Sequence, residues 1–212
     1  AGLGTALAPL GAVDLPLSGT LRARTLPSGA LDSLAVDLAA GGGTITPPAP
    51  LTAALRLERA TLKAEASQGL TRLRVEDLSL DLGGPRVEAR GRLDGLGADL
   101  VAVAEARVRD LPVARLRDLW PAGIGDNARD WILPNLTRGV VREATVSFAG
   151  HAAGGGGGLA GLAVDRLGGQ IRAEGVSVDY LNPMPPARHV AADCVFDAST
   201  FRVAVKSGEL FG

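Results

Sequence analysis

The sequence is poor in cysteine and in aromatic residues, and its charges nearly cancel. Its single cysteine, Cys194, excludes an intrachain disulfide, so the chain is not a disulfide-stapled domain. Aromatic side chains make up 3% of the 212 residues, which leaves little material for the aromatic-rich core of a tightly packed β-sandwich. The formal net charge of -1 provides no basic face for phosphates, and we therefore expect no nucleic-acid partner.

Long apolar runs are missing too. No stretch of about 20 apolar residues, the length that crosses a bilayer as a helix, and no signal-peptide pattern occurs in this sequence, and we expect that either could lie outside it. The only methionine is Met184, and residues 203–212 still read as a strand entering a turn. We therefore expect this chain to be an excerpt of a longer protein.

What the sequence does contain is alternation. Apolar residues recur at every second position in short runs separated by glycine, proline or aspartate, which is typical of half-buried antiparallel strands. The alternation changes from odd to even numbers after Val75, which predicts a β-bulge near Glu76 and Asp77. The clearest run is Leu73, Val75, Leu78, Leu80 and Leu82.

Further runs of the same kind bring the total to about ten strands, with Leu55 and Leu57 on one of them. A sheet with one apolar face can pair with a second sheet, close into a barrel, or form a curved groove around an apolar guest. The scarcity of bulky aromatic residues favours an open groove. Its expected lining continues through Val87, Ala89, Val101, Val103, Val146, Phe148, Val176, Val178 and Tyr180.

Residues 111–138 interrupt the β pattern and contain both tryptophans. Apolar residues have near-helical spacing up to Pro121, and Asp126 can cap a second short helix that Pro134 bends or ends. We expect one structural unit with β segments over 1–110 and 139–212 around this two-helix insert. The simplest role of the insert is to pack on the sheet, and a lid or docking surface is the alternative. The packing residues would be Trp120, Trp131 and Leu136.

Candidate catalytic, metal and cofactor sites are weak. Residues 156–161 match the glycine spacing of a dinucleotide-binding loop, but no βαβ unit surrounds them, and a plain loop is the better interpretation. Alternation puts His189 and Asp193 on one face of a strand and Cys194 on the other, and His151 has no carboxylate or thiol at useful spacing. We predict no catalytic residue, no metal, no cofactor and no enzymatic activity.

Two groups of motifs resemble YhdP-type members of the AsmA-like superfamily, and together they cover residues 111–212. The residues that carry the signature most clearly are Trp120, Pro121, Arg129, Trp131, Gly139, Pro185 and Pro186. The first group is Leu119-Trp120-Pro121, Ala128-Arg129-Asp130-Trp131-Ile132, Asn135-Leu136, Gly139-Val140-Val141 and Ala144. The second is Gly175-Val176-Ser177-Val178-Asp179-Tyr180-Leu181, Met184-Pro185-Pro186, Val190-Ala191-Ala192 and Phe196.

The resemblance implies a mainly β fold in which a long, twisted antiparallel sheet curves into an open, taco-like apolar groove. It implies a role in outer-membrane biogenesis, with phospholipid conducted between the two membranes of a Gram-negative cell envelope. The protein would be periplasmic and anchored to the inner membrane by a segment absent from this excerpt. Its partners would be phospholipid, the membrane through parts outside the excerpt, and neighbouring β segments that pair at the sheet edges.

Two alternatives remain open at this point. One is a structural or adhesive β-solenoid passenger on the cell surface, whose interior would be filled by its own side chains. The other is a scaffold for outer-membrane protein assembly that offers its sheet edge to client strands.

Overall fold

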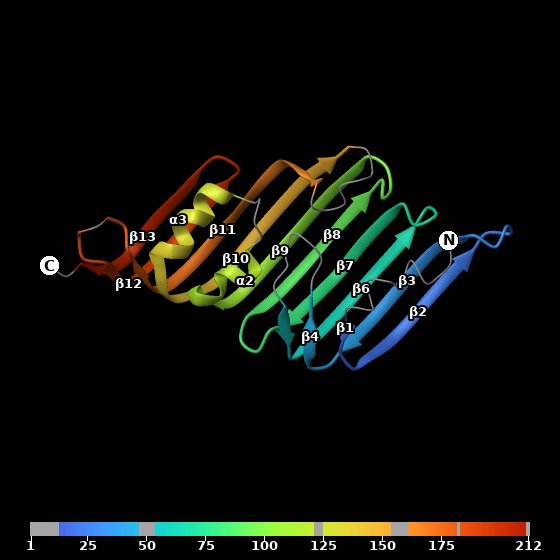
Figure 1. Ribbon diagram of the computed structural model, residues 1–212, viewed down its shortest axis with the longest axis horizontal. Coiled ribbons are helices and arrows are strands. Elements are labelled where there is room, and N and C mark those ends of the chain that lie inside the picture. The colour runs from blue at the N-terminus through green and yellow to red at the C-terminus, as the bar shows by residue number, and fades with distance from the viewer. Residues whose placement is uncertain (1–12, 47–53, 121–124, 154–160, 182, 211–212) are drawn as a thin grey trace.

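A ten-stranded antiparallel sheet dominates the computed structural model, which describes residues 13–46, 54–120, 125–153, 161–181 and 183–210 (Figure 1). The sheet is not closed into a barrel, and β2 and β13 are its edges. The mainly β fold with an open sheet is therefore confirmed. In spatial order the strands are β13 (Phe201–Leu210), β12 (Ala187–Asp197), β11 (Ala163–Val178), β10 (Leu136–Ala152), β9 (Leu100–Pro112), β8 (Arg86–Asp94), β7 (Arg72–Asp81), β6 (Arg59–Ser67), β3 (Leu31–Ala40) and β2 (Leu17–Thr25).

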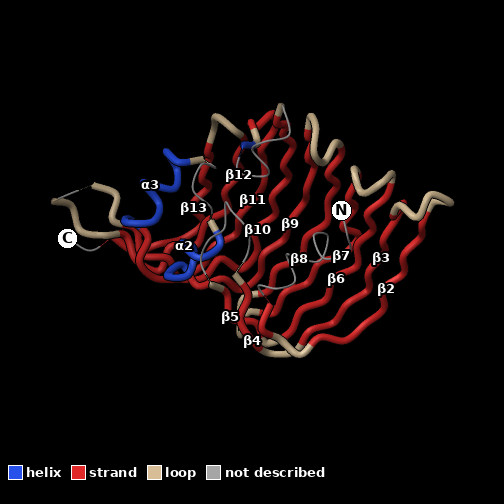
Figure 2. Tube along the Cα trace, turned by 45° about the vertical axis from the view of Figure 1, so that its right-hand side comes forward, coloured by secondary structure: helices blue, strands red, loops and turns tan. Residues whose placement is uncertain are grey.

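The strands follow one another in space almost as they do in the sequence. Each pairs with the next along the chain, except that β3 pairs with β6. Short turns join β2 to β3, β6 to β7, β7 to β8, β8 to β9 and β12 to β13, as the glycine, proline and aspartate punctuation of the sequence indicates. Figure 2 shows that the strands bend, so that the large sheet forms a curved surface.

The β-bulge in β7 is confirmed. Val75 pairs with Gly91 of β8, and Leu78 pairs with Ala89, so two residues of β7 lie opposite Arg90 alone. A bulge inserts one extra residue, and this keeps the leucines after it on the same face as those before it. Glu76 is the residue of β7 that has no partner on β6, and its carboxylate lies 3.1 Å from Nζ of Lys63 on that strand.

A separate three-stranded sheet covers part of the apolar face. It consists of β1 (Val13–Asp14), β4 (Gly43–Ile45) and β5 (Leu55–Leu57), in the order β1-β4-β5. Leu55 and Leu57 are buried in a cluster with Leu82, against which Leu80 and Val87 of the large sheet pack. Leu55 and Leu57 therefore belong to the small sheet and pack against the apolar face of the large sheet. They are not on a strand of the large sheet.

Three short helical segments lie within the expected insert. The insert is shorter than expected, because β9 continues to Pro112 and β10 begins at Leu136. The segments are the 3-10 turn η2 (Val113–Arg115) and the helices α2 (Leu116–Leu119) and α3 (Asp126–Asn135). Val113 is buried among Val176, Val190 and Ala192 of the sheet. Figures 1 and 2 show the helices and the small sheet on the same side of the large sheet. None of the described helices is long and apolar enough to cross a membrane.

Two expectations about the insert are wrong. Asp126 is the first residue of α3 and not its cap, because Gly125 takes the N-cap position with a φ of 64°. Trp131 is 47% exposed, and the neighbouring Ile132, at 7%, is the residue of α3 that is buried. Successive residues of a helix point about 100° apart, so only one of the two can face the sheet. Leu136 does pack against the cluster around Val113, as expected.

The remaining signature residues have local structural roles where they are described. Arg129 donates from Nε to the Trp120 carbonyl oxygen at 3.2 Å, which ties α3 to the end of α2. Gly139 has a φ of 98°, and a Cβ there would lie 2.7 Å from backbone atoms of β11. Pro185 and Pro186 lie between β11 and β12, and Pro121 lies outside the described residues.

Candidate functional site: the apolar face of the large sheet

Cross-strand pairing aligns the apolar residues into rows that cross the sheet from edge to edge. Paired residues point to the same face, so the register gives each row directly. One row is Gly19, Leu38, Leu62, Leu78, Ala89, Ala106, Val146, Gly169, Phe196 and Phe201. The next is Leu17, Ala40, Ala60, Leu80, Val87, Val108, Ala144, Ile171, Cys194 and Val203.

A third row crosses eight of the ten strands, namely Leu21, Val36, Ala64, Val75, Gly91, Ala104, Phe148 and Leu167. None of the three rows contains a charged side chain. At a strand spacing of about 4.8 Å, a row through ten strands is about 43 Å long. We call this surface the apolar face, and the opposite surface of the sheet the charged face.

Among the described residues, the two elements that cover the apolar face lie near the same end of its strands. The small sheet packs on Ala60, Leu80 and Val87, and the helical insert packs on Val176 and Val190. Away from these two clusters most of the lining is half-buried, as at Leu73, Val75, Leu78, Val146 and Phe148, and Ala104 is exposed. Ala64, Leu100 and Ala102 are buried there. Part of the apolar face is therefore accessible in the portion of the chain that the structure describes.

Most of the predicted lining residues lie on this face. The accessible part carries Leu73, Val75, Leu78, Ala89, Val146 and Phe148, and the covered end carries Leu80, Leu82, Val87, Val176 and Val178. Tyr180 follows the end of β11 and is 37% exposed, so it is not part of the sheet lining.

Val101 and Val103 were predicted on the apolar face, and this prediction is wrong. Val103 pairs with Arg92, and Val101 pairs with Asp94, so both valines lie on the charged face. Val101 is 47% exposed and Val103 is 40% exposed. The residues of β9 that continue the apolar rows are Ala102, Ala104, Ala106 and Val108. Alternation back from Glu105, Arg107 and Arg109 is the signal that identifies the correct face.

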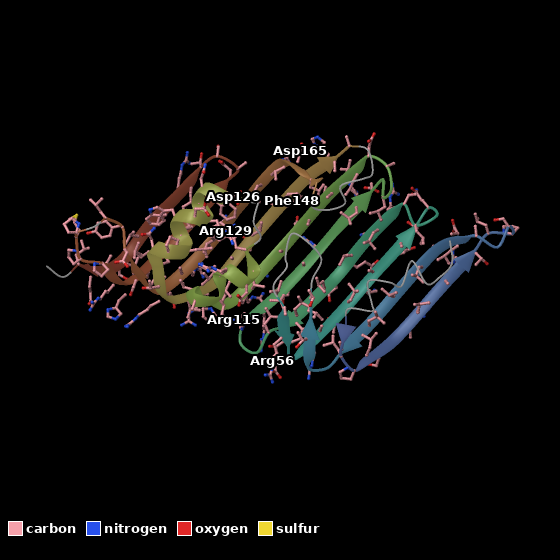
Figure 3. All side chains as sticks on the ribbon, viewed as in Figure 1. Arg56, Arg115, Asp126, Arg129, Phe148 and Asp165 are labelled. Carbon is pink, nitrogen blue, oxygen red and sulfur yellow. The ribbon has the colours of Figure 1, made fainter. Side chains whose placement is uncertain are left out.

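Two phenylalanine rings lie over glycines of the apolar face. A Cβ at Gly150 would lie 2.8 Å from Phe148 Cζ, and a Cβ at Gly169 would lie 2.7 Å from Phe196 Cζ. Phe196 also stacks on Phe201, with ring centroids 6.2 Å apart. Figure 3 labels Phe148 on β10. Rings held over glycines add apolar surface to the sheet without standing upright from it.

The charged face is covered by ion pairs that link neighbouring strands from β6 to β13. All of them involve exposed groups, so each adds little to stability, and together they make this face hydrophilic. From β6 onward they include Lys63 with Glu76, Arg72 with Asp94, Arg90 with Glu105, Arg107 with Glu143, Arg142 with Glu174, Arg172 with Asp193, and Lys206 with Asp193.

Two of these contacts shift a pKa. The pKa of Arg142 is raised mainly by its hydrogen bond to Glu174, and to a smaller extent by its hydrogen bond to Asp110. The hydrogen bond from Lys206, together with the charges of Lys206 and Arg172, lowers the pKa of Asp193. Both shifts show that the contacts favour the charged forms of these two groups.

The histidines and the cysteine do not form a site. His151 Nδ1 lies 2.7 Å from Asp165 Oδ1, which corrects the expectation that no carboxylate is near it, and His189 Nδ1 lies 3.2 Å from Glu209 Oε2. Cys194 is on the opposite face from Asp193, as expected, and burial raises the pKa of its thiol. Among the described residues, no group of three His, Cys, Asp or Glu side chains could hold a metal ion.

The glycine-rich stretch 156–161 lies outside the described residues except for Gly161. The chain is already in strand β11 from Ala163 onward, so no long helix follows the glycines. The pattern therefore lacks the helix that a dinucleotide-binding loop requires.

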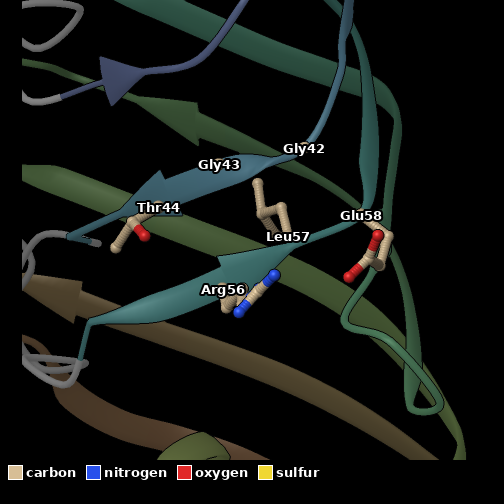
Figure 4. Close-up of a pocket in the computed structure, with 6 residues that line it drawn as sticks. All are labelled: Gly42, Gly43, Thr44, Arg56, Leu57 and Glu58. Atoms are coloured by element: carbon tan, nitrogen blue, oxygen red, sulfur yellow. The ribbon is translucent and has the colours of Figure 1, made fainter.

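An open pocket of about 420 Å³ lies at the small sheet (Figure 4). It is lined by Gly42, Gly43 and Thr44 on one side and by Arg56, Leu57 and Glu58 on the other. Thr44 and Arg56 are paired and exposed, whereas Leu57 is buried toward the large sheet. This pocket contains no arrangement of groups suited to catalysis, and the apolar face is the stronger candidate site.

No family model, curated protein or solved structure matches this chain.

Proposed function

We propose that this chain is a segment of a cell-envelope protein that shelters phospholipid acyl chains on its apolar face and conducts them between the inner and outer membranes. The observation that carries the proposal is the set of apolar rows that cross up to ten strands without a charged residue. A guest that moved along these rows would travel across the strands, from one edge of the sheet toward the other.

The energetics favour such a guest. Burying one CH2 group is worth about 0.8 kcal/mol, so a 16-carbon acyl chain exposed to water would cost on the order of 10 kcal/mol. A conduit has to shelter the chain at every step. The rows provide leucine, valine, alanine and phenylalanine side chains at successive strands, and no charge on them would hold a headgroup in place.

The proposal also specifies the ligand, the compartment and the contacts of the chain. Phospholipid is the proposed ligand, and the chain would act in the periplasm as a binding protein and not as an enzyme. Contact with membrane and the anchor in the inner membrane would come from parts outside this excerpt. The sheet edges would pair with neighbouring β segments.

The strand pairing argues against the β-solenoid alternative. A solenoid of that class stacks parallel strands coil upon coil, and all the strand pairs of this chain that the structure describes are antiparallel. A scaffold for outer-membrane protein assembly is favoured by one observation, the two open edges β2 and β13. That function would use the edges, whereas lipid conduction uses the face.

Two adjacent residues of β9 provide a matched test. Ala104 lies on the accessible apolar face, and Val103 lies on the charged face. Ala104→Glu places a carboxylate among the apolar rows. An acyl chain bound there would remove water from this carboxylate, which is costly, so the substitution should weaken lipid binding. Val103→Glu adds the same charge to the face that already carries Glu105.

The measurement is native mass spectrometry with lipid extraction on protein purified in mild detergent. We expect phospholipid to co-purify with the wild type and with Val103→Glu, and to be lost from Ala104→Glu. Folding of both variants is checked by circular dichroism. Equal lipid content in two folded variants would contradict the proposal.

A further inference from the structure

The edge strand β2 is suited to pairing with another strand. Its nine residues are all exposed, and its pairing with β3 is regular from Leu17 to Arg24. No described strand pairs with its other side. An edge of this kind presents a row of unpaired N–H and C=O groups, which an added strand can satisfy.

The charges on this edge are unbalanced. On the charged face, β2 carries Arg22 opposite Ala35 and Arg24 opposite Ser33. Among the described residues neither arginine forms an ion pair. From β6 to β13, in contrast, every two neighbouring strands are linked by at least one ion pair. Asp37 of β3 lies on this face opposite Thr20, so neither arginine has a carboxylate directly opposite it on β3.

We propose that the β2 edge binds a β-strand that places carboxylates beside Arg22 and Arg24, with apolar residues between them that continue the apolar face. The two carboxylates would be two residues apart, because side chains on one face of a strand recur with a period of 2. The apolar residues would extend the row that ends at Leu21. This inference rests on the edge and its charges, and it stands whether or not the face carries lipid.

The same charges disfavour end-to-end pairing of two copies of this chain. Neighbouring strands are antiparallel throughout, so β13 of one copy could continue the sheet at β2 of another. The charged face of β13 carries Arg202 and Lys206, and any register that sets one of them opposite Arg22 or Arg24 brings two cations together. Like charges on directly opposed strands are destabilising. An acidic strand is therefore a better partner for this edge than the chain's own β13.

The first test uses two labelled nine-residue peptides on the full chain. In one peptide Glu alternates with Val, and in the other Lys alternates with Val. Fluorescence anisotropy at low salt should show the Glu peptide binding about tenfold more tightly, because two attractive pairs replace two repulsive ones. Equal affinities, or no binding of the Glu peptide at millimolar concentration, would overturn the proposal.

The second test reverses the charge of the edge. In Arg22→Glu/Arg24→Glu the preference should switch to the Lys peptide, and the chain should gain salt-sensitive self-association through β13, seen by sedimentation velocity. Arg22→Lys/Arg24→Lys keeps the charge and should behave as the wild type. An unchanged preference for the Glu peptide after charge reversal would overturn the proposal. Neither readout depends on lipid, so failure of this inference is distinguishable from failure of the proposed conduit.

Discussion

At the scale of single residues, the face on which a side chain lies is determined by its charged neighbours more than by its own hydrophobicity. Val103 and Ala104 illustrate this, because the more apolar of the two lies on the charged face. The prediction from sequence selected valines on β9 and missed the alanines. Alternation from Glu105, Arg107 and Arg109 identifies the face correctly, since a strand has a period of 2.

The turn between β12 and β13 depends on one carboxylate. Asp197 Oδ1 accepts hydrogen bonds from the backbone N–H groups of Ser199 at 2.8 Å and Thr200 at 2.7 Å. The bonds from Ser199 are the main reason that the pKa of Asp197 lies below its usual value. A lowered pKa in the folded state means that the carboxylate contributes to stability above its ordinary pKa, and that this contribution is lost as the pH falls through the lowered value.

We expect Asp197→Ala to lower the urea midpoint at pH 7, and to lower it much less at a pH well below about 3.9, the ordinary value for Asp. The comparison of wild type and variant at each pH isolates this residue, because Asp193 titrates in both proteins. A difference in midpoint that stays constant down to acid pH would contradict the assignment.

At the scale of elements, local sequence patterns predict well where strands occur, and predict poorly which sheet each strand joins. The strands of the large sheet and the bulge in β7 follow from alternation, which is a property of neighbouring residues. The small sheet was missed, because the burial of Leu55 and Leu57 depends on residues distant in the sequence. The prolines at 47, 48 and 50, which separate this run from the one before it, are the available signal for a break in the sheet.

The insert gives a matched prediction for two adjacent residues. Ile132→Ala should cost about 2–5 kcal/mol in the free energy of unfolding, because it removes a buried aliphatic side chain. Trp131→Ala should cost less than about 1 kcal/mol, because about half of that side chain is already in solvent. Urea unfolding followed by circular dichroism measures both. A larger loss for Trp131→Ala than for Ile132→Ala would mean that α3 packs through its other face.

At the scale of the whole molecule, the chain is a curved sheet with one charged face, one apolar face and two open edges. The small sheet and the insert cover the apolar face near one end of the strands, and among the described residues most of the remaining lining is half-buried or exposed. Composition predicted the open sheet, because the chain has few aromatic residues with which to fill a second layer. The rows across the sheet could not be predicted from sequence, because they depend on the register between strands.

Conduction of lipid along the apolar face is tested by site-specific photocrosslinking to phospholipid in intact Gram-negative cells. A photoreactive phenylalanine analogue is placed at position 104, 106 or 146 on the apolar face, or at position 103, 105 or 147 on the charged face. Our account predicts phospholipid crosslinks from the first set and none above background from the second. Crosslinks of equal yield from both faces, or none from the apolar face of a folded and expressed protein, would contradict it.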